Sequence, residues 1–209
     1  MHDFQDRVES VSVRLILAGI GVSMTYELFQ LLEFFFSKGD NSRLPTYVDT
    51  LRSLFENSKH TFATKIAAAH LASLVFERFW PRMVVIPTQE MVASLNKMYK
   101  NSAEWQTRIA CLKALKKLIT ANPVNAAASY GDIYKLITRG NQEKMNEVRL
   151  AAAHCLARFC RAIDPKHLSS YLEGVLSLCN GRGLDDPHED TRQAFVDALK
   201  NVFSCNLRQ

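Results

Sequence analysis

Four segments of the chain open with a basic residue, continue with small and apolar residues, and recur at an almost constant interval. They begin at Lys65, Arg108, Arg149 and Arg192, which lie 43, 41 and 43 residues apart. A fixed period of this length is typical of helical solenoids, in which each unit is a pair of helices that buries its apolar face by stacking on its neighbours. Such a stack offers an extended surface rather than an enclosed pocket, so the sequence predicts a binding scaffold.

The residues inside these segments support the helical interpretation. Residues 65–70 read KIAAAH, and residues 149–154 repeat them as RLAAAH two periods later. In the three later copies, small residues alternate with large apolar ones at helical spacing, which lets a neighbouring helix approach closely. We therefore expect these segments to be the second helices of four pairs within residues 45–205.

A weaker amphipathic segment precedes each of these helices and is expected to be its antiparallel partner. The expected first helices are 47–55, 89–99, 130–137 and 168–179. Proline near the openings of three of them fits the first turn of a helix, where its missing N–H costs nothing. Side chains placed to cap the second helices are Ser102, Asn146 and Asp190.

An additional helix pair, 4–20 and 23–37, is expected before the first copy. With 47% apolar residues, only 8 glycines and 6 prolines, and almost no strand-like alternation, the chain is predicted to be all-α. The expected architecture is one α-solenoid array over residues 1–209, with a helix pair in 1–40 and four repeats in 45–205. It would contain four to five antiparallel helix pairs.

Large apolar residues crowd residues 13–36, and one helix pair cannot bury all of them on one inward face. We expect this surface to be completed either by self-association with a second chain or by further repeats. In the alternative interpretation, the first helix folds back across the end of the stack and covers residues 34–36. The candidate protein-binding residues are Trp80, Trp105, Phe34, Phe35 and Phe36. For the two tryptophans, the alternative is a structural role at a helix end.

The recurring basic residues have a structural interpretation and a ligand-binding one. Glu147 stands two residues before Arg149, and Asp190 two before Arg192, so stacked repeats could align them as a ladder of charge pairs. The net charge is +5, but the basic residues are dispersed, and no nucleic-acid partner is expected. Stacking of the helices could still assemble a basic face that the sequence does not show.

No motif for catalysis or for a metal or cofactor is visible, so we expect no enzyme and no such site. His70 and His154 recur at equivalent positions but stand about two repeats apart, too far to share an ion. The longest early apolar stretch, 15–24, is too short to span a bilayer. Buried free thiols in a reducing compartment are expected for the five cysteines, which are Cys111, Cys155, Cys160, Cys179 and Cys205.

Three longer stretches, in their order and spacing, carry a family resemblance. They are Ser102–Ile109, Ala126–Lys135 and Val148–Leu156, of which the last looks like a HEAT-repeat helix. Together they resemble the N-terminal part of the HEAT repeat-containing protein five family, the large accessory scaffolds of adaptor protein complex 1. Segments 64–68 and 190–194 also fit, so the resemblance covers about residues 23–205.

The resemblance implies a non-enzymatic HEAT-repeat scaffold in clathrin-dependent traffic between the trans-Golgi network and endosomes. The implied partners are adaptor or coat-associated proteins. The implied location is the cytoplasm, with association to Golgi and endosomal membranes only through those partners. Members of the family are far longer than this chain. Two alternatives stay open: a HEAT-repeat adaptor in nuclear transport or on microtubules, and a regulatory subunit of an enzyme complex.

Overall fold

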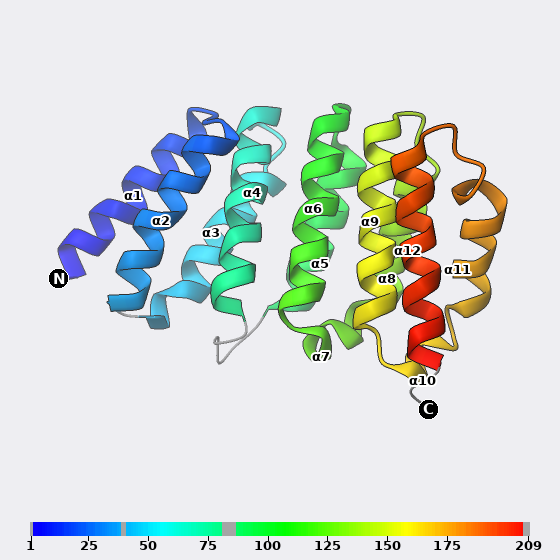
Figure 1. The fold of residues 1–209 in the computed structure, drawn as a ribbon. Helices are drawn as coiled ribbons and strands as arrows, with labels where there is room; N and C mark the ends of the chain where they lie inside the picture. Colours follow the sequence, from blue (N-terminus) through cyan, green and yellow to red (C-terminus); the bar gives the residue numbers. More distant parts are fainter. Residues whose placement is uncertain (1, 39–40, 81–86, 207–209) are drawn as a thin grey trace.

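The computed structural model describes residues 2–38, 41–80 and 87–206, and within these ranges it contains helices and turns but no strand. The helices pack in pairs, as Figure 1 shows, which confirms the predicted all-α fold. The first helices are α1 (His2–Leu17), α3 (Leu44–Glu56), α5 (Thr88–Asn101), α8 (Tyr130–Asn141) and α11 (Leu172–Leu178). The second helices are α2 (Val22–Lys38), α4 (Phe62–Phe79), α6 (Trp105–Ala121), α9 (Asn146–Ala162) and α12 (Glu189–Asn206).

The second helices form one continuous row. Helix α4 packs on α6, α6 on α9, and α9 on α12, while α2 extends the row on the other side of α4 (Figure 1). The first helices lie behind this row. The four helices that begin near the recurring basic residues therefore share one side of the stack, as the spacing predicts.

Small residues set the distance between the two layers. A Cβ atom added to Gly140 of α8 would lie 2.7 Å from the Cβ of Ala152 on α9, so the two backbones are in direct contact there. Next to this point, Cys155 and Leu156 are fully buried. The alternation of small and large residues thus works as expected, with small residues at the closest approach and large ones filling the space beside it.

The predicted helix 168–179 is interrupted. The short helix α10 (Pro165–Leu168) is capped by Asp164, whose Oδ1 accepts a hydrogen bond from the backbone N–H of His167 at 3.0 Å. The backbone N–H groups of Ser170 and Tyr171 then bond to carbonyls three residues back, which closes a tight turn before α11. A π-helical turn, Cys179–Gly183, follows α11, and a Cβ on Gly183 would collide with the ring of Phe195 at 2.4 Å.

The predicted capping residues have other roles. The Ser102 hydroxyl donates to the carbonyl of Met98 at 2.7 Å and so completes the end of α5. Asn146 and Asp190 lie inside the first turns of α9 and α12 rather than before them. The short helix α7 (Pro123–Ala126) follows α6 directly, with Pro123 in its first turn. None of the described helices is long and apolar enough to cross a membrane.

Candidate protein-binding face

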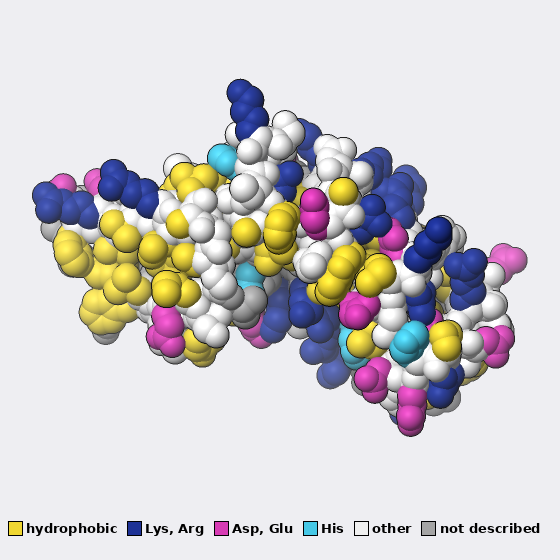
Figure 2. Space-filling model, turned by 90° about the horizontal axis from the view of Figure 1, so that it is seen from above, with side chains coloured by type: hydrophobic (Ala, Val, Ile, Leu, Met, Phe, Trp, Pro, Cys, Tyr) yellow, Lys and Arg dark blue, Asp and Glu magenta, His cyan; other side chains and the backbone are white. Residues whose placement is uncertain are grey.

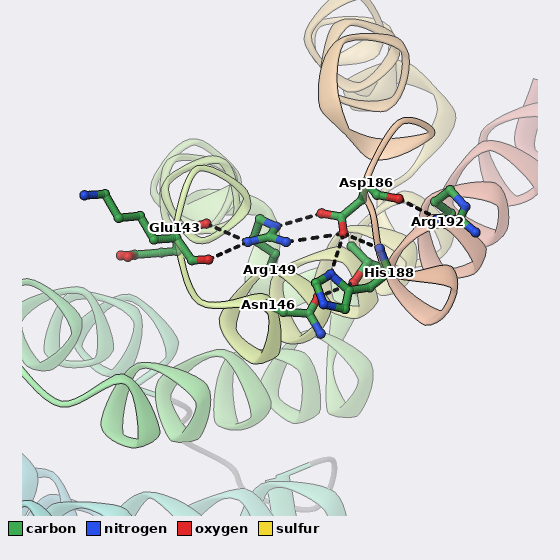
Figure 3. Close-up of polar contacts among 8 residues, drawn as sticks. Glu143, Asn146, Arg149, Asp186, His188 and Arg192 are labelled. Carbon is green, nitrogen blue, oxygen red and sulfur yellow. Dashed lines mark hydrogen bonds and ion pairs between the residues drawn. The ribbon is translucent and has the colours of Figure 1, made fainter.

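The recurring arginines join successive repeats along one edge of the stack (Figure 3). Arg149 Nε donates to Asp186 Oδ2 at 2.7 Å, and its Nη2 donates to Oδ1 at 3.3 Å. Its Nη1 donates to the backbone carbonyls of Glu143 and Lys144 at 3.1 and 2.7 Å. The two charged side chains are only 14% and 5% exposed, so this ion pair is held largely out of water.

Arg108 repeats the arrangement one unit earlier. Its Nη1 donates to both carboxylate oxygens of Glu143 at 2.9 and 2.8 Å, and its Nε and Nη2 donate to the carbonyl of Ser102. The Tyr99 hydroxyl also donates to Glu143, at 2.9 Å, and the guanidinium lies 5.7 Å from the centre of the Tyr99 ring. Burial and the neighbouring Glu143 raise the pKa of Tyr99, which keeps this hydroxyl protonated as a donor.

A ladder therefore exists, but its acidic partners differ from the predicted Glu147 and Asp190. Each arginine bonds to the carbonyl six residues before it. For Arg149 and Arg192 the residue at that position is Glu143 or Asp186, whose carboxylate binds the arginine of the preceding repeat. Glu147 and Asp190 lie in the exposed first turns of α9 and α12. The residue six positions before each arginine lies instead in the loop that precedes the helix, and this loop faces the neighbouring repeat. Arg192 is the last arginine of the ladder, and its Nη1 donates to the Asp186 carbonyl at 2.7 Å.

The environment of Asp186 favours its charged form. Burial alone would raise the pKa of this carboxyl, but hydrogen bonds from Arg149 and from the backbone N–H of His188 outweigh burial and hold the pKa below its ordinary value. Because these arginines are engaged by acceptors of the chain itself, the ladder has a structural role. Lys65 takes no part in it among the described residues, because the matching position in the next repeat, six residues before Arg108, is Ser102 and carries no carboxylate.

A groove of about 460 Å³ lies between α4 and α6 on the side formed by the second helices. Its apolar lining comes from half-buried side chains of the two helices, among which Ile66 and Ile109 stand at equivalent positions. These residues are Ile66, Leu74, Trp105, Ile109 and Ala110. The groove is open to solvent and comparable in volume with small ligand sites.

One side of this groove is basic. Lys117 pairs with Glu77 at 2.6 Å, but Lys113 and Lys116 have no carboxylate within ion-pair distance in the described part of the chain. Lys116 is half-buried, and its pKa is lowered mainly by burial and also by the nearby cations Lys117, Arg158 and Lys113. These four cations are called the α6–α9 cluster below.

The α6–α9 cluster continues along the row of second helices. A second depression along α6, α9 and α12 is lined by Lys116, Arg158, Arg161 and Lys200, and also by Asp197, which pairs with Lys200. Figure 2, seen from above, shows a group of Lys and Arg side chains at the lower edge near the middle of the molecule. Stacking has therefore assembled a basic face from positions that are dispersed in the sequence, although the groove beside it is apolar.

His70 and His154 lie at equivalent positions on this face, each next to a lysine of α6. Burial lowers the pKa of His70, and Lys113 lowers it further; burial and Lys116 act in the same way on His154. The Nδ1 atom of His70 is buried without a hydrogen-bond partner. The described residues contain no group of three or more His, Cys, Asp or Glu side chains that could hold a metal ion.

The aromatic candidates separate into buried and accessible residues. Trp80 is fully buried and packs edge-on against Phe76 at 4.6 Å, and Phe36 is buried against Tyr47. Their burial removes Trp80 and Phe36 from the residues that a partner can reach. Trp105 is half-buried and lines the groove between α4 and α6.

The other two phenylalanines lie at the N-terminal end of the stack. Phe35 is half-buried under Phe4 of α1, with ring centres 5.3 Å apart, while Phe34 is 58% exposed. Met24 and Leu31 are also about half exposed, and Figure 2 shows hydrophobic side chains gathered at this end. Helix α1 thus covers part of α2 and leaves Met24, Leu31 and Phe34 as an exposed apolar face.

The cysteines whose side chains the structure describes are buried free thiols, as predicted. Burial raises the pKa of Cys155 to about 12 and that of Cys179 to about 11, and it also raises the pKa of Cys111. Thiols in such surroundings stay protonated and unreactive at neutral pH. The side chain of Cys205 lies outside the described residues.

Comparison with known proteins supports a HEAT-repeat protein. Residues 86–179 match the model of the HEAT-repeat domain of ECM29, described as a proteasome adapter and scaffold protein. Over 172 residues, the chain is 24% identical to Protein SWEETIE of Arabidopsis thaliana. The matched region is 82% of this chain but only 8% of that relative. No solved structure matches the chain.

Proposed function

We propose that the chain is a non-enzymatic segment of a protein-binding scaffold, and that the row α4, α6, α9 and α12 is the face that receives the partner. The observation that carries this proposal is the groove between α4 and α6, where half-buried apolar side chains meet unpaired lysines. The arginine ladder supports the proposal indirectly, because it fixes the register of the repeats of α6, α9 and α12 within this face.

We further propose that the scaffold works in clathrin-adaptor-dependent traffic between the trans-Golgi network and endosomes, with adaptor or coat-associated proteins as partners. The support is the ordered resemblance of three segments to the HEAT repeat-containing protein five family. The chain matches only 8% of the length of Protein SWEETIE, which is consistent with a short segment of a larger scaffold. On this proposal the protein acts in the cytoplasm and reaches Golgi or endosomal membranes only through its partners.

Proximity labelling from the tagged chain in living cells, followed by mass spectrometry, tests this proposal. Enrichment of adaptor-complex subunits over a tagged unrelated solenoid is the expected result. Enrichment of nuclear transport factors or tubulin would instead favour the alternative of a HEAT-repeat adaptor in another pathway. Stoichiometric recovery of a kinase or phosphatase catalytic subunit would favour the regulatory-subunit alternative, and no enrichment at all would reject the scaffold function.

A further inference from the structure

We infer that the groove between α4 and α6 binds an acidic peptide segment of a partner protein, with an apolar side chain in the groove and carboxylates on the lysines of α6. This inference rests on the proposed scaffold function and specifies the chemistry of its partner. It names one surface and one class of ligand, so it can fail while the scaffold function stands.

The apolar part of the site is formed before any partner arrives. Ile66 of α4, Ile109 at the equivalent position of α6, and Trp105 all line the groove. All three side chains are half-buried, so they offer apolar surface that further burial would stabilise by roughly 25 cal/mol per Å². A leucine or phenylalanine of a peptide has the shape and chemistry to occupy this space.

The basic part of the site is only partly neutralised, because Lys117 pairs with Glu77 whereas Lys113 and Lys116 have no carboxylate within ion-pair distance among the described residues. Lys116 is half-buried among Lys113, Lys117 and Arg158, and Glu77 is the acidic side chain that lines the same groove. Like charges held this close together repel one another, and partial burial strengthens the repulsion. An incoming carboxylate would reduce that repulsion, so the site should prefer anionic ligands.

The spacing of the lysines matches a peptide. Lys113 lies three residues before Lys116 and four before Lys117 on α6, so their side chains project from one face within one helical turn. Carboxylates one turn apart on a partner helix have the same separation. His70 of α4 also lines the groove.

A peptide fits this surface better than a nucleic acid does. Single-stranded nucleic acids are typically bound along a basic track with exposed aromatic rings on which successive bases stack. The groove has one aromatic residue, Trp105, which is half-buried at the apolar end, and its other apolar side chains are aliphatic. Three or four residues of an acidic amphipathic segment would use both halves of the groove at once.

Selection from a display library of random peptides of about sixteen residues, with the chain immobilised, tests the inference; such peptides can span the groove as a helix. We expect the selected peptides to share at least two acidic residues and a large apolar residue one turn away. Their affinities, measured by fluorescence anisotropy, should weaken as salt concentration rises. Selected peptides without acidic residues would overturn the inference, as would failure to select any peptide.

Variants then locate the site. Lys113→Glu, at an exposed position, and Ile66→Gln should each weaken binding of the selected peptides by about ten-fold or more. The matched control is Lys100→Glu, an exposed lysine at the end of α5 with the same change in net charge. Thermal melting identifies any variant that is unfolded. If Lys113→Glu is unfolded, Lys113→Gln is tested in its place. Equal loss in the control, or no loss in the groove variants, would overturn the inference.

Two competitors complete the test. A single-stranded oligonucleotide should not displace the peptides at equal concentration, and displacement would assign the groove to nucleic acid instead. Excess unlabelled chain should not displace them either, since displacement would assign the groove to a second copy. If proximity labelling recovers partners that the groove variants do not lose, the scaffold function stands and the groove is not its contact site.

Discussion

Arg149 and Asp186, 37 residues apart in the sequence, form the most buried ion pair in the described part of the chain. Arg149 belongs to the start of α9 and Asp186 to the loop before α12, so the pair joins two successive repeats. Each of the two side chains also has hydrogen bonds within its own repeat. This combination leaves neither charge uncompensated, although both are held away from water.

Replacing Arg149 by alanine should therefore destabilise the chain by about 3 kcal/mol, because Asp186 stays buried without its partner. Urea denaturation followed by circular dichroism measures the change. The control is Arg7→Ala, which breaks the exposed pair between Arg7 and Asp3 and should cost less than about 1 kcal/mol. Similar losses in both variants would mean that burial of the ladder pair has no energetic consequence.

Gly140→Ala should destabilise the chain by about 1–3 kcal/mol through overpacking. The added Cβ would lie 2.7 Å from the Cβ of Ala152 and 3.2 Å from Leu112, so α8 would have to move away from its neighbours. At Gly181 an added Cβ meets nothing within 4 Å, and Gly181→Ala should leave the melting temperature unchanged or slightly higher. A neutral Gly140→Ala would show that the two layers adjust more easily than their contact indicates.

The two histidines on the second-helix face should make the stability dependent on pH. Burial and the adjacent lysines lower the pKa values of His70 and His154, while Asp190 and Asp197 act in the opposite direction on His154. A lowered histidine pKa gives stability that is present above the ordinary value of 6.5 and is lost as pH falls through the folded-state value.

The free energy of unfolding should thus decrease between about pH 7 and pH 5. Urea titrations at both pH values measure the decrease, and the double variant His70→Gln, His154→Gln should reduce it. Asp186, whose pKa is lowered from 3.8, acts in a separate window, because its contribution is present above that value and is lost in stronger acid. An unchanged pH dependence in the double variant would contradict the assignment to these histidines.

The exposed apolar face at the N-terminal end should bind a dye that fluoresces on apolar surfaces. Leu31→Glu combined with Phe34→Glu should reduce this fluorescence, since both side chains are about half exposed and their replacement leaves the buried Leu32 and Phe36 in place. Light scattering during size-exclusion chromatography shows whether the same variant changes self-association. Equal dye binding by the variant would place the accessible apolar surface elsewhere.

The second helices could be predicted from the sequence because their start residues and small-residue pattern recur with a period close to 42. The register of the ladder could not be predicted in the same way. Glu147 and Asp190 are nearest to the arginines in sequence, but the loop before each second helix brings Glu143 and Asp186 opposite the preceding repeat. Glu143 and Asp186 do recur six residues before the arginine of their own repeat, but the sequence does not show that this loop turns its carboxylate toward the preceding repeat.

The groove could not be predicted from the sequence either, although its basic side could. Lys113, Lys116 and Lys117 are the tightest basic group in the chain, and their spacing predicts one face of a helix. Ile66 and Ile109 stand 43 residues apart, and they line the same groove only because α4 and α6 pack with matching rotation. For Trp80 and Phe36, aromatic character alone did not separate a core residue from an exposed one.

The absence of Lys65 from the arginine ladder gives the stack two kinds of junction. Between α6, α9 and α12, arginines bound on both sides resist sliding of one repeat against the next. Between α4 and α6, the ion pair across the groove is Glu77 with Lys117, and that pair is exposed and therefore weak. The two C-terminal junctions are thus fixed by arginine bonds, whereas the junction at the groove depends on apolar packing and one exposed pair, so a partner that enters there need not break a buried ion pair to reach its site.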